Sequence, residues 1–322
     1  MSLLEGRTFY KPMQYEWAFE AFKLQHQMHW IPEEVPLHDD VLDWQRKLSE
    51  EEKNLITQIF RFFTQADCDI QDAYLDKYIP VFKPYEVRMM LSTFAAVEGI
   101  HMHAYSLLLD TIGMPETEYK AFTEYEAMVA KHDYMLEFNT KSKSGIAKSL
   151  AVYSGFTEGM QLFSSFAILL NFTRFGKMNG MGQIITWSIR DESLHVDSMI
   201  KLFRAFIQEH PRVWTKQVKE EIYEIAQKMV FLEDKFIDLA FEMGGVEGLT
   251  PKEVKEYIRY ITDRRLIQLG LKGHYNQRTN PIPWLEWMLN APEHTNFFEN
   301  KSTEYAKGAM KGSWGEVWAK SK

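Results

Sequence analysis

The sequence predicts an all-α helical bundle. Apolar residues recur with helical periodicity over most of the 322 residues, whereas strand-like alternation is rare and β-branched residues are scattered within helical patterns. Hydrophobic residues make up 45% of the chain and aromatic residues 14%, which is enough for a large core. We therefore expect one helical domain over residues 1–298. A flexible tail at 299–322 should follow, because that stretch is too polar to bury much apolar surface.

The expected helices begin and end at recognisable residues. Ser49 precedes three glutamates, which makes a good N-cap with an acidic first turn. Pro80 ends that helix, and Pro84 suits the first turn of the next one. The Ile31–Pro36 stretch is expected to be extended or turning, because residues before proline avoid the helical region. The predicted helices are 13–29, 49–78, 84–113, 115–132, 146–174, 179–208, 213–243 and 251–271.

Composition excludes several classes of function. With 37 basic and 45 acidic residues the formal net charge is −8, which argues against a protein that grips nucleic acid by neutralising phosphates. The single cysteine, Cys68, excludes an intrachain disulfide and a thiolate metal site, and it fits a reducing compartment. No signal-peptide pattern and no charge-free run of eighteen apolar residues is present, so we expect a cytoplasmic protein that does not enter a membrane.

Two Glu-x-x-His motifs carry the clearest chemistry. They are Glu98-Gly-Ile-His101 and Glu192-Ser-Leu-His195, and each lies within a long apolar helical stretch. Residues three apart share one face of a helix, so the carboxylate and the imidazole of each motif can reach one metal ion together. One such motif is common by chance, but a pair is typical of carboxylate-bridged dimetal bundles, which add one carboxylate from each of two further helices.

The two further carboxylates are found upstream of the motifs. Asp67, Asp69 and Asp72 interrupt an apolar, aromatic-rich helix, and Glu158 lies in another mostly apolar helix. A carboxylate in such surroundings is costly to bury unless it is paired or bound to metal. Carboxylates with imidazoles and no thiolate favour iron or manganese over structural zinc. The expected ligand set is Asp67, Glu98, His101, Glu158, Glu192 and His195.

Two residues beside this set have two interpretations each. Tyr105 lies one turn beyond His101 and faces the same region, so it is either an oxidisable tyrosine in a dry pocket or a core tyrosine bonded to a ligand carboxylate. Asp191 precedes Glu192 and points off the metal face. It is either the partner of a ligand histidine's free N–H or a surface acid paired with Arg190.

These motifs, taken together, resemble one family over nearly the whole chain. The chain is similar to the small, radical-generating subunit of class I ribonucleotide reductase, a member of the ferritin-like dimetal-carboxylate superfamily. The matching stretches are Trp30-Ile-Pro-Glu-Glu-Val, Ala66-Asp-Cys-Asp-Ile-Gln-Asp72, Glu98-Gly-Ile-His101 with Tyr105, Glu158, Arg190-Asp-Glu-Ser-Leu-His195 and Asn296-Phe-Phe-Glu.

The resemblance implies a role for each of these residues. The family's metal ligands fall on the six residues of the expected set, with Asp67 preferred to Asp69 because it precedes Glu98 by 31 residues, the family's usual interval. The radical tyrosine falls on Tyr105. The electron path toward the partner would use His101, Asp191 and Trp30, and the tail tyrosine that relays the radical falls on Tyr305.

The implied activity is the supply of an oxidising equivalent. An oxygen-derived oxidant would react with a reduced pair of Fe or Mn ions. The equivalent would pass to the large subunit, which reduces ribonucleotides to deoxyribonucleotides and docks the tail. Members store it as a tyrosyl radical, in some cases loaded through a flavoprotein, or on a high-valent manganese pair, and they are homodimers. The alternatives are a ligand-binding dimetal oxidase without a partner subunit and a ferritin-like metal store.

Overall fold

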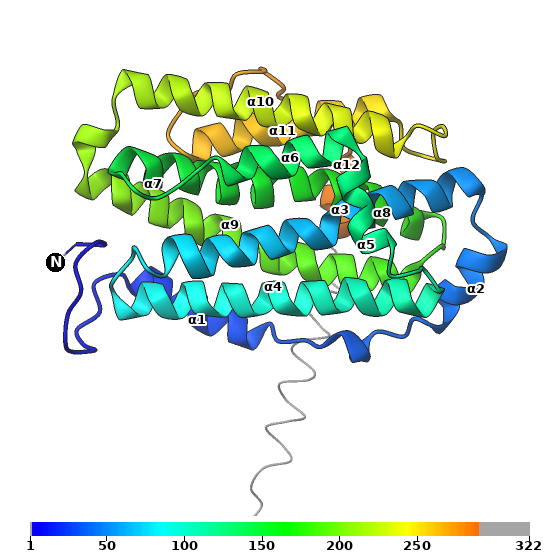
Figure 1. Ribbon diagram of the computed structural model, residues 1–322, viewed down its shortest axis with the longest axis horizontal. Helices are drawn as coiled ribbons and strands as arrows, with labels where there is room; N and C mark the ends of the chain where they lie inside the picture. The colour runs from blue at the N-terminus through cyan, green and yellow to red at the C-terminus, as the bar shows by residue number, and fades with distance from the viewer. Residues whose placement is uncertain (1, 290–322) are drawn as a thin grey trace, which may run out of the picture. The chain divides into compact units, whose positions relative to one another are not determined.

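The computed structural model describes residues 2–289, which are predominantly helical (Figure 1). In this range no β-strand forms, and a single isolated bridge pairs Val246 with Leu249. The all-α prediction is therefore confirmed. The α-helices are α1 (Glu16–Gln27), α2 (His38–Arg46), α3 (Glu50–Asp72), α4 (Tyr85–Ile112), α5 (Glu118–Ala121), α6 (Glu126–Leu136), α7 (Lys143–Leu150), α8 (Leu162–Arg174), α9 (Asn179–Glu209), α10 (Lys216–Ala240), α11 (Pro251–Gln268) and α12 (Pro283–Leu289).

Residues 2–282 form one compact unit, and a second unit begins at Pro283. Helix α12 is the described part of the second unit. The predicted boundary between residues 298 and 299 lies outside the described residues and stays a prediction. Within residues 2–289, no helix combines the length and the hydrophobicity that crossing a membrane requires.

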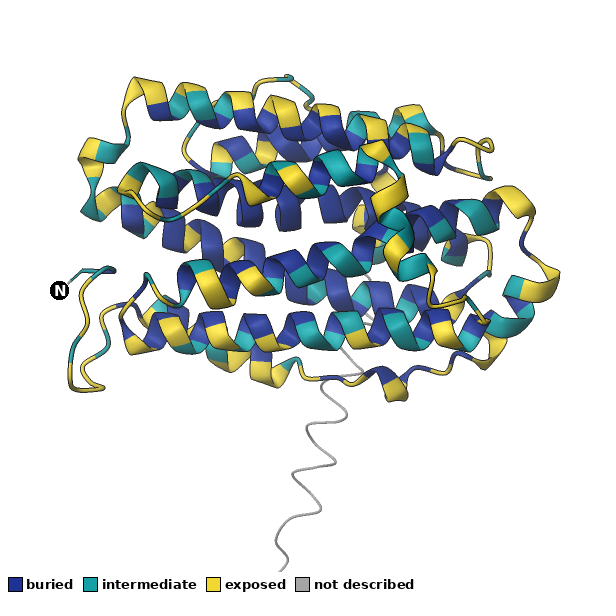
Figure 2. Ribbon diagram, viewed as in Figure 1, coloured by how far each residue is buried: buried dark blue, intermediate teal, exposed yellow. Residues whose placement is uncertain are grey.

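Four long helical segments form the core of the first unit. Helices α7 and α8 are joined by the π-helical segment η4 (Ala151–Gln161) into one continuous helix. Helix α3 packs on α4, α4 packs on α9, and α9 packs on this continuous helix. Helix α1 lies along α4, and α10 and α11 lie side by side on the opposite side of the bundle (Figure 1). Buried residues line the inner faces of these helices, and exposed residues line their outer faces (Figure 2). Four apolar faces thus meet along one axis.

Two of the four core helices contain π-helical turns. The predicted helix 49–78 is α3 followed by the π-helical segment η2 (Ala73–Tyr78), and the predicted helix 146–174 contains η4. Helix α3 begins as the sequence predicts, with Ser49 and Glu52 forming a capping box. Arg265 of α11 donates to the carbonyl of Gly159 at 2.7 Å, and a Cβ at Gly159 would lie 2.7 Å from the Arg265 Nε. Glycine is therefore needed at this close approach in η4.

Helix α2 was not predicted, yet it fixes the start of α9. The carboxylate of Asp40 accepts hydrogen bonds from Gly180 N at 2.9 Å and Met181 N at 2.6 Å. Asp43 accepts from Met178 N at 2.9 Å. Both aspartates are buried, and their negative charge suits the positive end of the α9 dipole. A nine-residue helix is too short to be stable alone, so α2 depends on these contacts rather than on an apolar face.

The prediction of one helix over residues 115–132 is wrong. The chain forms α5, a 3-10 turn η3 (Phe122–Glu124) and α6, with extended backbone at Tyr125. Arg61 of α3 explains the break, because its guanidinium binds Glu118 at 2.5 Å and the Tyr125 hydroxyl at 2.6 Å. The Ile31–Pro36 stretch is extended at Ile31 and then forms a 3-10 turn, η1 (Pro32–Glu34), which agrees with the expectation of an extended or turning segment.

A buried ion pair joins α6 to α10. Lys131 Nζ lies 2.6 Å from Glu233 Oε2, and the two side chains are 2% and 0% exposed. The ammonium group also lies over the rings of Phe62 and Phe236, 4.5 Å and 4.2 Å from their centroids. Ser164 of α8 donates to the other oxygen of Glu233. This pair therefore connects the outer helices to the core.

Removing one partner of this pair should be strongly destabilising. We expect Lys131→Met to lower the free energy of unfolding by about 3–5 kcal/mol, because Glu233 would keep a buried charge without a counterion. Urea unfolding monitored by circular dichroism measures this loss. Lys252 of α11, 84% exposed and 3.8 Å from Glu256, offers the matched control, and Lys252→Met should change stability by no more than about 0.5 kcal/mol. Equal effects in the two variants would contradict the prediction.

Candidate metal centre

The structure brings the six predicted ligands together in the middle of the core. Asp67 comes from α3, Glu158 comes from η4, and the two Glu-x-x-His motifs come from α4 and α9. Every one of the six side chains is at most 1% exposed. They form two groups whose ligand atoms lie within 4.8 Å of one another, namely Asp67, Glu98 and His101, and Glu98, Glu158, Glu192 and His195. Glu98 belongs to both groups, so it is placed to bridge two ions.

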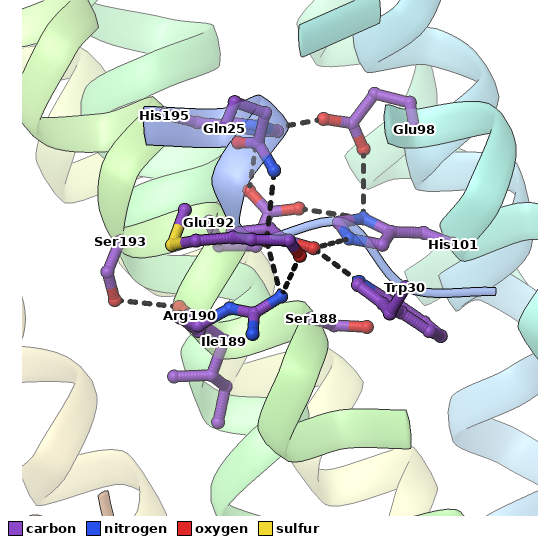
Figure 3. Close-up of polar contacts among 12 residues, drawn as sticks. Gln25, Trp30, Glu98, His101, Ser188, Ile189, Arg190, Glu192, Ser193 and His195 are labelled. Carbon is purple, nitrogen blue, oxygen red and sulfur yellow. Dashed lines mark hydrogen bonds and ion pairs between the residues drawn. The ribbon is translucent and has the colours of Figure 1, made fainter. Parts of the chain in front are cut away.

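The histidines point their Nδ1 atoms at the carboxylates. His101 Nδ1 lies 3.4 Å from Glu98 Oε2 and 3.2 Å from Glu192 Oε1. His195 Nδ1 lies 3.0 Å from Glu98 Oε1 and 3.6 Å from Glu158 Oε1. Figure 3 shows His101 and His195 converging on Glu98 and Glu192 from two sides. The donor atoms therefore surround a common interior space.

The donor atoms fit a pair of cations. Among the described residues, both oxygens of Asp67, Glu158 Oε2 and Glu192 Oε2 are buried without a hydrogen-bond partner, and the two oxygens of Glu98 have none beyond their contacts with the two histidines. Buried polar atoms are rarely left unsatisfied, and carboxylates least of all. Two divalent ions would balance the four negative charges, and oxygen and imidazole donors suit iron or manganese. The cluster can therefore hold a dimetal site.

Burial and mutual interactions shift the pKa values of the carboxylates and imidazoles in the cluster. Burial, and then the charge of Glu98, raise the pKa of Asp67 well above its usual range and that of Glu192 to about 8. Burial lowers the pKa of His195, but hydrogen bonds with Glu158 and Glu98 outweigh it and raise that pKa to about 10. Burial also raises the pKa of Glu98, yet its hydrogen bonds to the two histidines lower it overall.

The two candidate aspartates of α3 lie in different surroundings. Asp67 lies in the cluster and has no hydrogen-bond partner within residues 2–289. Asp69 instead binds His132 Nδ1 at 2.6 Å and accepts a hydrogen bond from Gln65 at 2.9 Å. Two residues along a helix correspond to about 200° of rotation, so the two carboxylates point to different sides.

Asp191 is buried at the centre of a hydrogen-bond network. Its Oδ2 accepts from Trp30 Nε1 at 2.7 Å and lies 3.3 Å from His101 Nε2, and its Oδ1 accepts from Gln25 at 3.0 Å and from Arg190 at 3.2 Å. Burial raises the pKa of Asp191, but its hydrogen bond and charge interaction with His101 outweigh it and lower that pKa. With its proton on Nε2, His101 presents the lone pair of Nδ1 to the cluster. Figure 3 shows His101 and Trp30 side by side in this network.

Tyr105 lies in an apolar pocket beside the cluster. Its ring packs against Phe63 and Phe60 at centroid distances of 4.8 Å and 5.7 Å, and Phe166 packs behind Phe63. Its hydroxyl donates to Ser188 Oγ at 3.2 Å, and both residues are at most 1% exposed. Its hydrogen-bond partner is therefore a serine of α9 and not a carboxylate of the cluster.

The sequence interpretation missed three residues that contact the predicted set. Tyr74 donates to Glu158, Ser188 accepts from Tyr105, and Gln25 donates to Asp191. Tyr74 follows Asp67 by seven residues and Ser188 precedes Glu192 by four, so each shares a helix face with a predicted ligand. That periodicity could have revealed Tyr74 and Ser188. Gln25 lies in a separate helix and has no such pattern. Tyr305 lies outside the described residues.

A bundle whose core helices enclose four carboxylates and two histidines defines the class of carboxylate-bridged dimetal proteins. Residues 7–281 match the family model described as "Ribonucleotide reductase, small chain". The chain therefore belongs to the ribonucleotide reductase small-chain family, the radical-generating subunits of that enzyme.

Curated relatives agree with this assignment. The chain is 46% identical to a "Probable ribonucleoside-diphosphate reductase small subunit 376L" of Invertebrate iridescent virus 6, with 99% of each chain covered. It is 32% identical to the "Ribonucleoside-diphosphate reductase subunit beta" of Chlamydia pneumoniae, over 91% of this chain and 88% of that protein. The sequence-based recognition of the family is therefore confirmed.

Solved structures share the ferritin-like helical fold. The ribonucleotide reductase R2 subunit of Clostridium botulinum superimposes with a TM-score of 0.83 at 22% identity, covering 90% of this chain and 94% of that one. The dimanganese(II) NrdF protein of Streptococcus sanguinis gives a TM-score of 0.73 at 22% identity, covering 85% and 97%. The predicted fold is confirmed, and the dimetal oxidase and the metal store are not favoured. The family implies a large-subunit partner and a dimeric assembly.

Metal binding to this cluster should release protons. At pH 7 Glu192, with a pKa of about 8, is protonated, and His195, with a pKa of about 10, is an imidazolium. Ligation needs the carboxylate and the neutral imidazole, so both protons must leave. We expect calorimetric titration with Mn(II) at pH 7 to show heats that depend on the ionisation enthalpy of the buffer. The affinity should rise as the pH increases through 8, where Glu192 loses its proton. Heats independent of the buffer would contradict this expectation.

Proposed function

We propose that Asp67, Glu98, His101, Glu158, Glu192 and His195 bind two ions of iron or manganese, and that Tyr105 stores the oxidising equivalent of a ribonucleoside-diphosphate reductase. When bound, the metal pair supplies that equivalent by reaction with an oxygen-derived oxidant. One observation carries this proposal. Glu98 belongs to both groups of candidate ligands, and each group contains buried carboxylate oxygens that have no hydrogen-bond partner in the described part of the chain. A structural core would satisfy such atoms within the protein.

The pocket around Tyr105 supports its role as the storage residue. Its aromatic neighbours exclude water from the ring, and the Tyr105 hydroxyl is buried. Burial, and then the charge of Asp67, raise the pKa of Tyr105 well above its usual range, so the phenol keeps its proton until it is oxidised. Ser188 fixes the direction in which that O–H bond points.

The hydrogen bonds of Asp191 support a path from the cluster toward the surface. His101, Asp191 and Trp30 form a continuous series of contacts of 3.3 Å and 2.7 Å. Their rings are also close, since the centroids of Trp30 and His101 lie 6.1 Å apart. We assign these residues to electron transfer and Tyr305 of the tail to the relay across the subunit interface.

The partners follow from the same assignment. The large subunit carries the nucleotide site, since a chain whose single cysteine is Cys68 cannot supply a set of reactive thiols. The tail, residues 299–322, docks on that subunit, the small subunit is a homodimer, and a flavoprotein activates the centre where manganese is used. A single cysteine also suits the cytoplasm as the place of action.

Replacing Tyr105 tests where the equivalent is stored. We expect Tyr105→Phe to keep two metal ions per chain and to lose the narrow tyrosyl signal in electron paramagnetic resonance spectra after activation. Ribonucleotide reduction with the large subunit should fall to background. Full activity in this variant would contradict the assignment. A multiline signal from coupled manganese in the wild type, without an organic radical, would move storage to the metals.

Replacing Tyr305 separates storage from transfer. We expect Tyr305→Phe to keep the metal content and the Tyr105 signal of the wild type and to lose ribonucleotide reduction, because phenylalanine cannot form the phenoxyl radical. Steady-state assays with the large subunit measure this loss. Tyr10, which is 43% exposed, provides the control, and Tyr10→Phe should retain activity. Wild-type turnover by Tyr305→Phe would show that another residue relays the radical.

A further inference from the structure

A second buried tyrosine reaches the cluster from a different helix than Tyr105. Tyr74 lies at the start of η2, and its hydroxyl donates to Glu158 Oε1 at 2.6 Å. Tyr74 and Glu158 are each 1% exposed. A phenol bound to a carboxylate at this distance forms a charge-assisted hydrogen bond, which is about twice as strong as a neutral one.

This hydrogen bond makes the two oxygens of Glu158 unequal. Oε1 accepts from Tyr74 and lies 3.6 Å from His195 Nδ1, whereas Oε2 is buried and has no hydrogen-bond partner among the described residues. Asp67, on the other side of the cluster, has both oxygens free of such partners. The Tyr74 hydrogen bond therefore fixes the orientation of the Glu158 carboxylate, whereas no such bond holds Asp67.

Tyr74 itself is held rigidly. Its ring packs edge-on against Phe94 and His195, with centroid distances of 6.0 Å and 6.2 Å. It also packs against Tyr78, 6.1 Å away, one turn further along η2.

The backbone around Glu158 is irregular, and residues near Tyr74 hold it in place. Glu158 lies within η4, where the regular α-helical hydrogen-bond pattern is replaced by π-helical turns. Residues of η2 hold the helix that contains η4, since the Tyr78 hydroxyl donates to the carbonyl of Ser149 at 3.0 Å and Lys77 binds the Tyr153 hydroxyl. Of these contacts between the two helices, the Tyr74 hydrogen bond is the one that acts on a predicted ligand.

We propose that Tyr74 is a positioning residue that holds the Glu158 carboxylate in the orientation that completes one metal position, the one built from Glu98, Glu158, Glu192 and His195. The other position, built from Asp67, Glu98 and His101, does not depend on it. This inference rests on the proposed metal centre. Loss of the Tyr74 hydroxyl should therefore weaken the binding of one ion and leave the other unchanged.

The test is a Mn(II) titration of the metal-free, full-length Tyr74→Phe variant beside the wild type. Phenylalanine keeps the ring contacts with Phe94 and His195, so the fold should be retained, and circular dichroism checks this. Calorimetry should show one binding step with a dissociation constant about 10–100-fold higher than in the wild type, and one step unchanged. At limiting Mn(II), electron paramagnetic resonance should show isolated ions in the variant where the wild type shows coupled pairs.

Tyr78→Phe is the matched control. It removes a hydroxyl that is equally buried and lies in the same π-helical segment, but that hydroxyl bonds to Ser149 and not to a ligand. We expect this variant to bind both ions like the wild type. Unchanged binding in Tyr74→Phe, or equal weakening in both variants, would overturn the role of Tyr74. A wild type that fails to bind two Mn(II) ions would instead contradict the metal centre itself, and Tyr74's role with it.

Discussion

The repulsion among four carboxylates buried in one apolar interior is the constraint on which the rest of this structure depends. Two unit charges 4 Å apart interact by about 4 kcal/mol at an effective dielectric constant of 20. The core contains several such pairs, since Glu98 faces Asp67, Glu158 and Glu192. Only cations or protons can relieve this repulsion. The carboxylates stay close together only because each is attached to a rigid helix. The close packing of the four helical segments α3, α4, η4 and α9 keeps these helices in place.

Neighbouring residues divide the surroundings of the cluster into two sides with different chemistry. On one side, Asp191 connects His101 to Trp30 through charged, directional hydrogen bonds. On another, Tyr105 is enclosed by Phe60 and Phe63, and its hydroxyl donates to a neutral serine, Ser188. A polar side suits the movement of charge, whereas an apolar side suits the preservation of a reactive species. The same helix, α9, contributes to both sides.

Much of this arrangement could be predicted from periodicity alone. The long helices and the convergence of their acids follow from apolar faces and from residues spaced by three and four. Helix α2 could not be predicted, because its stability comes from Asp40 and Asp43 binding a distant helix end. The break near Tyr125 depends on one arginine of α3, which no local pattern reveals. Tyr74 was detectable by its register with Asp67, but its partner lies 84 residues away in the chain.

The anchoring of α9 has a consequence for how this chain can change in length. Its first turn is clamped by α2, and Ser188, Asp191, Glu192 and His195 follow on fixed faces of one uninterrupted helix. One inserted residue between the clamp and these side chains would rotate all of them by about 100° around the helix axis. Insertions and deletions in relatives should therefore be absent from this stretch and gather in the connections between helices. A relative with an insertion or deletion inside this stretch would no longer direct these side chains into the cluster.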